Sequence, residues 1–374
     1  MIKRNTFATK PGKIEEINYL RGFGVLAVIA IHTTGYFTVI KEFNSLVLLT
    51  LWTDVFSQFA VPLFILISGF VLARNYRNDF PLIDFYKKRI RSIIPQYLLF
   101  SVLYTAFNNW AAMKASSLST NFKLLLKNIW HADASYHLWF FLLIIVFYLL
   151  YPIIIRLYTL FKQRDRAEQF LALLLILQTL FMVSLHTPYL AGTRVNFIGF
   201  LFYFGLGIYT ADHYKQLKEG FKRQTSILFT MSMALTLGSS FFIIIGLTTG
   251  YRYNTTPDYF FIGSELVYPM FRVVTFLLLY NVARYLLEKK KSVLAKVMNK
   301  IGQYSFGIYL IHIFFNQSAI KLLKDYQIGF DDWVFYPIVY LVTVVLSYLS
   351  VRVISFMPFS YYIIGFQSPK RTLK

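Results

Sequence analysis

The chain has 374 residues, of which 57% are hydrophobic and 15% are charged, whereas soluble domains carry roughly 25% charged residues. Its apolar residues fall in runs of about 20, the length that crosses a bilayer as a helix, which excludes an ordinary soluble domain. Cysteine is absent, which excludes thiolate catalysis, disulfides and cysteine-ligated metals. The net charge is +21, but the basic residues alternate between loops and therefore indicate membrane topology rather than nucleic-acid binding.

The apolar runs predict an all-α, polytopic membrane protein with ten spanning helices. The predicted spans lie near residues 17–37, 46–73, 92–112, 137–156, 168–186, 195–212, 225–247, 266–286, 301–320 and 333–355. When the N-terminus is placed in the cytoplasm, the cytoplasmic segments hold 28 Lys and Arg residues and the outer segments hold 8. Because cytoplasmic loops carry the excess of basic residues, both termini are predicted to lie inside.

The chain is predicted to form a single membrane domain, 1–374, because no linker is long enough to separate a second folded unit. Its cytoplasmic ends are the N-terminal segment, 1–16, and the tail, 357–374. The N-terminal segment has no apolar stretch before a small-residue cleavage site, so the first span is expected to be retained as an anchor. The second half does not repeat the first, which weakens a secondary-transporter interpretation.

The first span carries two ionisable residues, Arg21 and His32, that a lipid-facing helix is not expected to have. They are 11 residues apart, which is about three helical turns, so both side chains lie on one face about 16 Å apart in depth. Such a polar stripe faces protein or a water-filled cavity and indicates a functional site. The alternative is that Arg21 extends to the headgroups and His32 bonds a neighbouring helix.

The second span is 28 residues long and contains Pro62 and Gly69, which predict a broken helix of the kind that lines a cavity. Asp54 lies in its outer part, within about 4 Å of the depth of His32. A carboxylate at this depth would orient and charge the imidazole. Asp54 equally fits a cap at the break in the helix, and both interpretations stand.

Basic residues crowd the cytoplasmic start of the third span, in the order Lys87, Lys88, Arg89 and Arg91. The common explanation for such a cluster is topology-setting charge that binds anionic lipid. The alternative is a phosphate-binding patch, because the fork of a guanidinium group matches phosphate oxygens.

Two later stretches add candidate site residues. His137 and Trp139 are predicted at the outer interface, where Trp commonly anchors a span and His137 could contact an external acceptor. Ser305 is predicted toward the cytoplasmic side and His312 deeper, where packing is favoured over catalysis. The sequence has no nucleophile elbow, P-loop or HExxH motif, and its six His residues show no metal-ligand spacing on one helix, so no metal is expected.

Five stretches, taken in order, resemble the acyltransferase 3 family of integral membrane acyltransferases. They are Arg21 to His32, LFILISGF ending Ser68-Gly69-Phe70, FYKKRIRSIIPQY with Pro95, HLWFF, and IGQYSFGIYLIH. The resemblance covers nearly the whole chain and includes the count of ten spans. Family members often carry two arginines three residues apart before the proline. Here Ser92 stands three residues after Arg89, and Arg91 comes one position early.

The resemblance implies an O-acyltransferase that moves an acyl group, usually acetyl, from cytoplasmic acyl-CoA to a hydroxyl of a cell-surface or lipid-linked glycan. The candidate catalytic residues are His32, Arg21 and Asp54. In this reaction His32 would act as general base on the acceptor hydroxyl, and Arg21 would orient the donor. The residues expected to hold the donor are Lys88, Arg89, Arg91 and Ser68. The residues expected to bind the acceptor are His137, Trp139 and His312.

No tightly bound cofactor is expected, because acyl-CoA, in particular acetyl-CoA, is the donor substrate. The other expected partners are the glycan or lipid-linked sugar acceptor and the lipids of the cell membrane; nucleic acid is not expected. The alternative function is export or flipping of a polysaccharide or lipid-linked sugar, which needs a wide polar path and two access states. Intramembrane polar residues are few and lie around the first three spans, which favours the transferase.

The charge distribution gives a testable topology. In this cysteine-free chain, a single cysteine placed at Thr255 should react with a reagent confined to the outside of the cell. A cysteine placed at Lys290 should not react, because the 284–300 loop is predicted to be cytoplasmic. Labelling of whole cells measures both, and the reverse pattern would contradict the ten-span topology.

Overall fold

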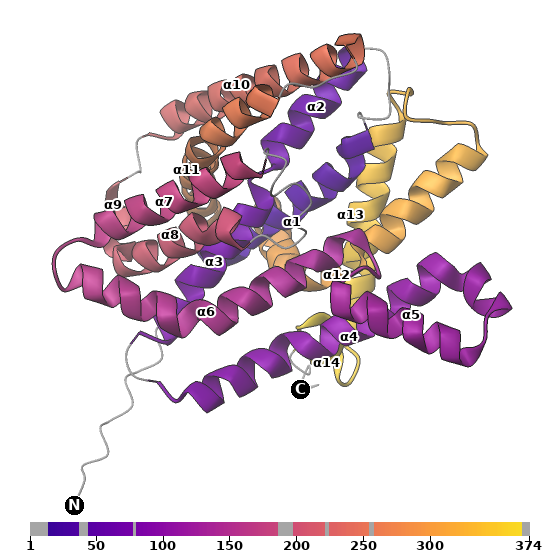
Figure 1. Cartoon of the computed structure of the whole chain (residues 1–374), viewed down its shortest axis with the longest axis horizontal. Coiled ribbons are helices and arrows are strands. Elements are labelled where there is room, and N and C mark those ends of the chain that lie inside the picture. Colours follow the sequence, from indigo (N-terminus) through magenta and orange to yellow (C-terminus); the bar gives the residue numbers. More distant parts are fainter. Residues whose placement is uncertain are drawn as a thin grey trace, which may run out of the picture.

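The computed structural model describes residues 14–36, 44–77, 80–185, 197–220, 224–253 and 258–368. Thr255, the outer labelling position named above, lies outside these ranges. All regular structure within them is helical, which confirms the predicted all-α class. Figure 1 shows long helices gathered around α1 (Glu16–Thr34), which runs through the middle of the molecule.

Eight helical segments of the described chain are long and apolar enough to cross a membrane, which supports a multi-pass membrane protein. They are formed by α2 (Ser45–Ser57) with α3 (Ala60–Asn75), α4 (Leu82–Ala115), η2 (Tyr136–Leu138) with α6 (Trp139–Lys162), α7 (Ala167–Ser184), α10 (Thr225–Tyr253), α11 (Asp258–Glu288), α12 (Val293–Asp325) and α13 (Phe335–Ile354).

The two remaining predicted spans correspond to α1 and α8. α1 has 19 residues and carries the polar side chains of Asn18, Arg21 and His32, which lower its mean hydropathy. The sixth predicted span is η3 (Ile198–Phe200) followed by α8 (Leu201–Asp212), a shorter apolar helix. The count of ten spans and the orientation of the termini therefore stay predictions.

The second predicted span is broken, as expected, although its proline and glycine act differently from the expectation. α2 ends at Ser57 and α3 begins at Ala60, so Pro62 lies in the first turn of α3, where its missing N–H breaks no helical hydrogen bond. Gly69 lies inside α3 rather than at a bend. A Cβ there would stand 2.3 Å from the carbonyl oxygen of Phe204 in α8. Gly69 therefore lets α3 and α8 pack backbone against backbone.

The backbones of α1 and α12 also touch. A Cβ built on Gly302 would lie 1.6 Å from the carbonyl oxygen of Asn18, and one built on Gly22 would lie 3.0 Å from that of Met298. The Asn18 Nδ2 atom donates a hydrogen bond to Asn299 Oδ1 at 2.9 Å, which adds a polar contact at the same level. Because no side chain fits between the helices at Gly302, their relative register is fixed at this point.

A helical hairpin supports the segment that leads into α6. α5 (Leu118–His131) returns along α4, and the Asn128 Nδ2 atom donates to Thr105 Oγ1 at 3.0 Å. Beyond the end of α5, the carbonyl oxygen of Ala134 accepts a hydrogen bond from Asn108 Nδ2 at 2.8 Å. These bonds place the start of α6 beside α4.

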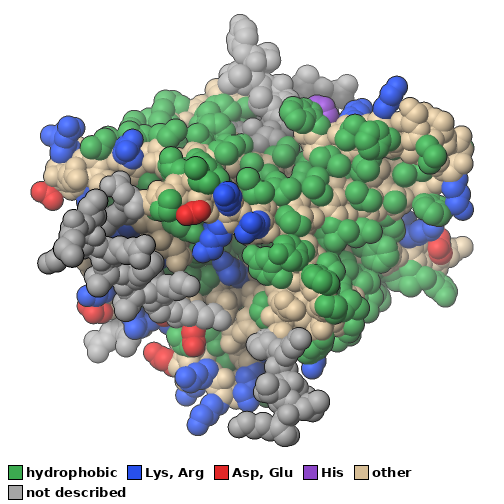
Figure 2. Space-filling view, turned by 90° about the horizontal axis from the view of Figure 1, so that it is seen from below, with side chains coloured by type: hydrophobic (Ala, Val, Ile, Leu, Met, Phe, Trp, Pro, Cys, Tyr) green, Lys and Arg blue, Asp and Glu red, His purple; other side chains and the backbone are tan. Residues whose placement is uncertain are grey.

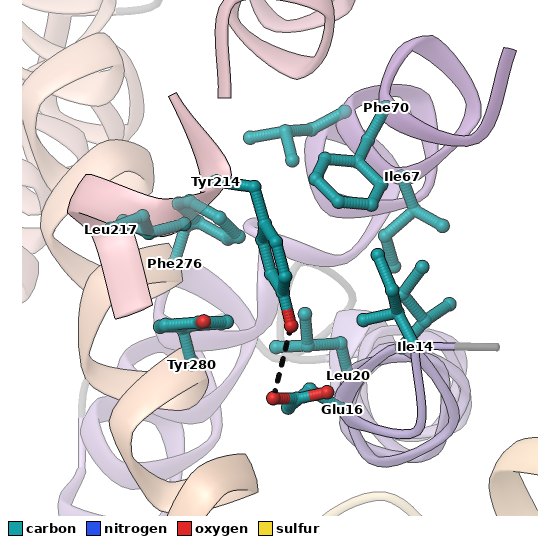
Figure 3. Close-up of a pocket in the computed structure, with 11 residues that line it drawn as sticks. Ile14, Glu16, Leu20, Ile67, Phe70, Tyr214, Leu217, Phe276 and Tyr280 are labelled. Carbon is teal, nitrogen blue, oxygen red and sulfur yellow. Dashed lines mark hydrogen bonds between the residues drawn. The ribbon is translucent and has the colours of Figure 1, made fainter. Parts of the chain in front are cut away.

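The N-terminal end of α1 is held by a buried polar contact. There the Tyr214 hydroxyl of α9 (Tyr214–Gly220) donates to Oε1 of buried Glu16 at 3.2 Å (Figure 3). Burial, together with the Glu16 carboxylate, raises the pKa of Tyr214 to about 12, so its hydroxyl stays protonated and remains a donor. The adjoining cavity measures only about 20 Å³, enough for about one water, which indicates a packing site.

Basic side chains outnumber acidic ones on the face in Figure 2. This face has broad apolar areas, with Lys and Arg side chains at its edges and in a group near its middle. At the end of α8, Asp212 pairs with Arg77 at 2.5 Å and with Lys162 at 2.6 Å. This arrangement is typical of a lipid-facing surface whose helix ends carry the charge.

The contact between α1 and α12 predicts a strong effect of one added methyl group. Gly302→Ala should destabilise the protein by more than the ~1–3 kcal/mol typical of overpacking, because the methyl group meets backbone rather than a movable side chain. Gly238→Ala is the matched control, since apart from the backbone of its own helix no atom of the described structure lies within 4 Å of a Cβ there. Thermal unfolding in detergent measures both. Equal melting temperatures for Gly302→Ala and wild type would contradict the packing described.

Candidate active site

A cavity of about 410 Å³ lies among α1, α3, α4, α6, α12 and α14 (Ser360–Ile364), within the size range of small-ligand pockets. The polar residues among its lining are Asn18, Arg21, Ser68, Ser92, Tyr148, Gln303, Ser305, Tyr309 and Tyr361. Arg21 and Ser68 were both predicted as site residues, and both lie here. The described lining includes a cation but no carboxylate, so the cavity favours an anionic or polar ligand.

Arg21 and Arg89 both interact with Tyr148. The Tyr148 hydroxyl interacts electrostatically with both arginines and is hydrogen-bonded to Arg89. The guanidinium carbon of Arg89 lies 5.5 Å from the centre of the Tyr148 ring, and the Arg89 Nε atom is buried without a partner among the described residues. Arg89 does not itself line the cavity but contacts the lining residue Tyr148, and its Nε atom retains hydrogen-bonding capacity for a ligand.

The other basic residues at the start of α4 differ in position. The Lys88 Nζ atom lies 5.8 Å from the Tyr76 ring centre. The guanidinium carbon of Arg89 lies 5.6 Å from the same ring centre. Arg91 is exposed and does not line the cavity, whereas Ser92 does. Residues three apart share a helix face. Ser92, three residues after Arg89, therefore faces the cavity, and Arg91, two residues after Arg89, does not.

Three histidines from three helices meet on the other side of Tyr309. The rings of His32 and His312 are stacked with centres 5.3 Å apart, and those of His137 and His312 are 5.2 Å apart. The Tyr309 ring lies 5.4 Å from His137 and 5.7 Å from His312. We call His32, His137 and His312 the histidine cluster. Their positions in the sequence did not predict that the three rings would meet, and for His312 packing was favoured over catalysis.

The hydrogen bonds of the cluster leave imidazole nitrogens available. His312 Nδ1 donates to the Tyr309 carbonyl oxygen at 2.6 Å, so the Nε2 atom of a neutral His312 carries a lone pair. His137 Nδ1 pairs with Ser135 Oγ at 3.0 Å. The Nε2 atoms of both rings are buried without a partner among the described residues. Such atoms are costly to leave unpaired and therefore favour a polar ligand or water.

The cluster is reached past His32 rather than His137. His137 is 1% exposed and His312 is fully buried, whereas His32 is half-buried. Tyr136, whose ring centre lies 4.9 Å from that of His32, is 48% exposed. A molecule approaching from this side would meet Tyr136 and His32 first.

Asp54 has hydrogen-bond partners on two segments. Gln58 Nε2 donates to its Oδ2 atom at 3.1 Å, and Thr34 is its second hydrogen-bond partner. Gln58 follows the last residue of α2, whereas Thr34 is the last residue of α1, two residues after His32. The first contact fits a role at the helix break and the second brings Asp54 near the end of α1, so both interpretations stand. Among the contacts of the described residues, none joins Asp54 to His32.

Trp139 lies apart from the histidine cluster. Its ring packs against Phe140 at 6.4 Å and Phe200 at 6.1 Å between ring centres. Its described contacts are therefore packing contacts toward η3, and its predicted role in acceptor binding stays a prediction.

Sequence reasoning missed the tyrosines that link the two parts of the site. Tyr309 lines the cavity, and its hydroxyl donates to the His137 carbonyl oxygen. The Tyr104 hydroxyl donates to the Leu310 carbonyl oxygen at 2.9 Å and accepts from the Phe314 N–H at 3.2 Å. The spacing of Tyr309 three residues before His312 was a usable signal, since it places both on one face of α12.

The comparisons with known proteins cover most of the chain. The acyltransferase domain of the acyltransferase 3 family matches residues 14–352. A Bacillus subtilis protein provisionally named a membrane-bound acyltransferase is 24% identical over 329 residues, 84% of each chain. A Staphylococcus aureus protein provisionally named a poly-beta-1,6-N-acetyl-D-glucosamine export protein is 24% identical over 267 residues, 68% of each chain. No solved structure matches.

The family match extends from the start of α1 into α13, so it includes the histidine cluster and the cavity lining other than Tyr361, Gly365 and Phe366. It also agrees with the multi-pass helical architecture. The chain therefore belongs to the acyltransferase 3 family and is a membrane acyltransferase.

Proposed function

We propose that the protein transfers a short acyl group, in particular acetyl, from cytoplasmic acyl-CoA to a hydroxyl of a cell-surface or lipid-linked glycan. The observation that supports this most directly is the cavity with Arg21 in its lining and Arg89 beside it, lined by no described carboxylate. Acyl-CoA carries phosphates at one end and a thioester at the other. A cationic cavity behind a basic rim suits such a donor.

The donor would lie with its phosphates near Arg89 and Lys88 and its pantetheine arm in the cavity. Pantetheine alternates amide groups with short apolar segments. The cavity offers both kinds of surface, with Gln303 and the hydroxyl groups of Ser68 and Ser305 beside apolar side chains. Arg21 would orient the arm, the role that the family resemblance implies for it.

The histidine cluster would serve the acceptor. In the proposed step, His32 takes the proton of the acceptor hydroxyl, the oxygen attacks the thioester carbonyl, the C–S bond breaks, and the CoA thiolate finally takes up a proton. The half-buried His32 is the member of the cluster that an acceptor can approach, and hydroxyl protons are the natural partners of imidazole lone pairs. The location that we propose is the plasma membrane, and the predicted topology would place the acceptor outside.

Export of a polysaccharide is the second candidate, because the Staphylococcus aureus relatives carry names for export of poly-beta-1,6-N-acetyl-D-glucosamine. An exporter needs a wide path with two access states. The described cavity is about 410 Å³ and ends at aromatic side chains, which supports transfer over passage of a sugar chain. Deletion of the gene followed by measurement of ester-linked acyl groups and of total surface glycan separates the two functions.

The basic rim gives a prediction about donor binding. Arg89→Ala and Lys88→Ala should each weaken acyl-CoA binding and reduce its dependence on salt, because a charge-assisted phosphate contact is lost. Lys87→Ala is the matched control, since Lys87 is exposed and no described contact places it over the Tyr76 ring, where Lys88 and Arg89 lie. Equilibrium binding of acyl-CoA to purified protein at two ionic strengths tests this. If both variants bind acyl-CoA with the wild-type affinity, the basic cluster sets membrane topology and does not bind the donor.

The proposed general base gives a prediction about turnover. His32→Ala and His32→Gln should lower acyl transfer by about 10²–10⁴-fold, because neither side chain takes up a proton at neutral pH. His131→Ala is the control, since this exposed histidine ends α5. CoA release from acetyl-CoA with a soluble glycan acceptor, followed over pH, measures the effect.

Two further results would separate the roles of the neighbouring groups. Asp54→Asn should lower turnover much less than His32→Gln, because Asp54 bonds Gln58 and Thr34. If His32→Gln kept the wild-type rate and pH profile, His32 would be a packing residue and the proposed mechanism would be wrong.

A further inference from the structure

The outer end of the cavity is formed by one aromatic residue from each of three helices. α12 runs away from the predicted cytoplasmic side and α3 and α6 run toward it, so helix direction gives the depth of each lining residue. On this basis the outermost lining residues are Phe64 on α3, Phe140 on α6 and Tyr309 on α12. All three are aromatic, whereas the lining at the opposite end includes Asn18 and Arg21.

These three rings form a connected group. The ring centres of Phe140 and Tyr309 are 5.5 Å apart, and those of Phe140 and Phe64 are 6.3 Å apart, both with edge-to-face geometry. The Phe64 ring is also held against α1, because a Cβ built on Gly24 would lie 3.0 Å from it. Gly24 lies between Arg21 and His32 in the sequence. We call Phe64, Phe140 and Tyr309 the aromatic filter.

The aromatic filter separates the cavity from the histidine cluster. Tyr309 contacts His137 and His312 on its far side and lines the cavity on its near side. His32 belongs to the cluster and is not among the residues that line the cavity, although Arg21 on the same helix is. An acyl group that starts in the cavity must therefore pass these rings to reach His32.

We propose that the aromatic filter selects the length of the acyl group and shields the donor thioester from water on the acceptor side. The inference rests on the proposed donor site in the cavity. An acetyl group, with one methyl beyond its carbonyl, passes between ring edges with small side-chain motion. Longer chains require the rings to separate, which opposes the edge-to-face contacts and the packing of Phe64 on α1.

Removing one ring should therefore relax the selection. Phe140→Ala and the milder Phe140→Leu should raise the ratio of kcat/KM for butyryl-CoA to that for acetyl-CoA by at least about 10-fold, the lower end of what one methylene contributes to discrimination in an apolar pocket. Phe64→Leu should act in the same direction from a different helix. Hydrolysis of acetyl-CoA without acceptor should rise in each variant.

Phe147→Leu is the matched control on the same helix. Phe147 is fully buried, its ring stacks on Phe204 at 4.5 Å, and it does not line the cavity. Phe147→Leu should destabilise the protein, as core substitutions do. It should not change the ratio of kcat/KM for butyryl-CoA to that for acetyl-CoA. A general loosening of the protein would alter the ratio in Phe147→Leu as well, and that result would overturn the inference.

Binding of unreactive donors provides a readout that needs no turnover. Wild type should bind the thioether S-ethyl-CoA at least about 10-fold more tightly than S-hexyl-CoA, and Phe140→Leu should reduce this difference. If wild type binds both compounds equally, the proposed selection by the aromatic filter is wrong, although the donor site is supported. The same conclusion follows if Phe140→Leu and Phe140→Ala keep the wild-type preference. If wild type binds neither compound, the donor site and the filter fail together.

Discussion

The direct contact between the backbones of α1 and α12 is the constraint on which the site depends. No Cβ fits on Gly302 against the Asn18 carbonyl oxygen, so the two helices cannot shift past each other without losing contact. α1 carries Arg21 and His32, and α12 carries His312 as well as part of the cavity lining. One contact therefore fixes the position of the cavity relative to the histidine cluster. Gly69 allows the same kind of contact between α3 and α8.

Features that depend on a single helix were predictable from the sequence, because helical periodicity is local. Arg21 reaches the cavity and His32 the histidine cluster, as their shared face on α1 indicated. The cluster itself was not predictable, because His137 and His312 come from two other elements, η2 and α12, whose positions relative to α1 are set by tertiary packing. Scattered histidines without metal-ligand spacing gave no sign that three rings would meet.

Asp54 shows what matching depth can and cannot predict. Its predicted depth agreed with that of His32, and one of its hydrogen-bond partners, Thr34, lies two residues after His32 on α1. The other partner, Gln58, is four residues along the same segment and is therefore always within reach. Depth alone could not decide which side chain near the end of α1 Asp54 would contact, because that depends on tertiary packing. Pro62 depends on a local helix boundary instead, since it fits the first turn of α3 rather than kinking a longer helix.

Separating the cavity from the histidine cluster limits what can move through the membrane. In the proposed reaction, CoA stays on the side of Arg21 and the glycan on the side of His32, about 16 Å farther along α1. Only the acyl group passes the aromatic filter, so neither a phosphate nor a sugar crosses apolar protein, which would be costly for both. A path for one small uncharged group needs few buried polar side chains. The scarcity of intramembrane charge in this chain is therefore compatible with chemistry that joins two sides of a membrane.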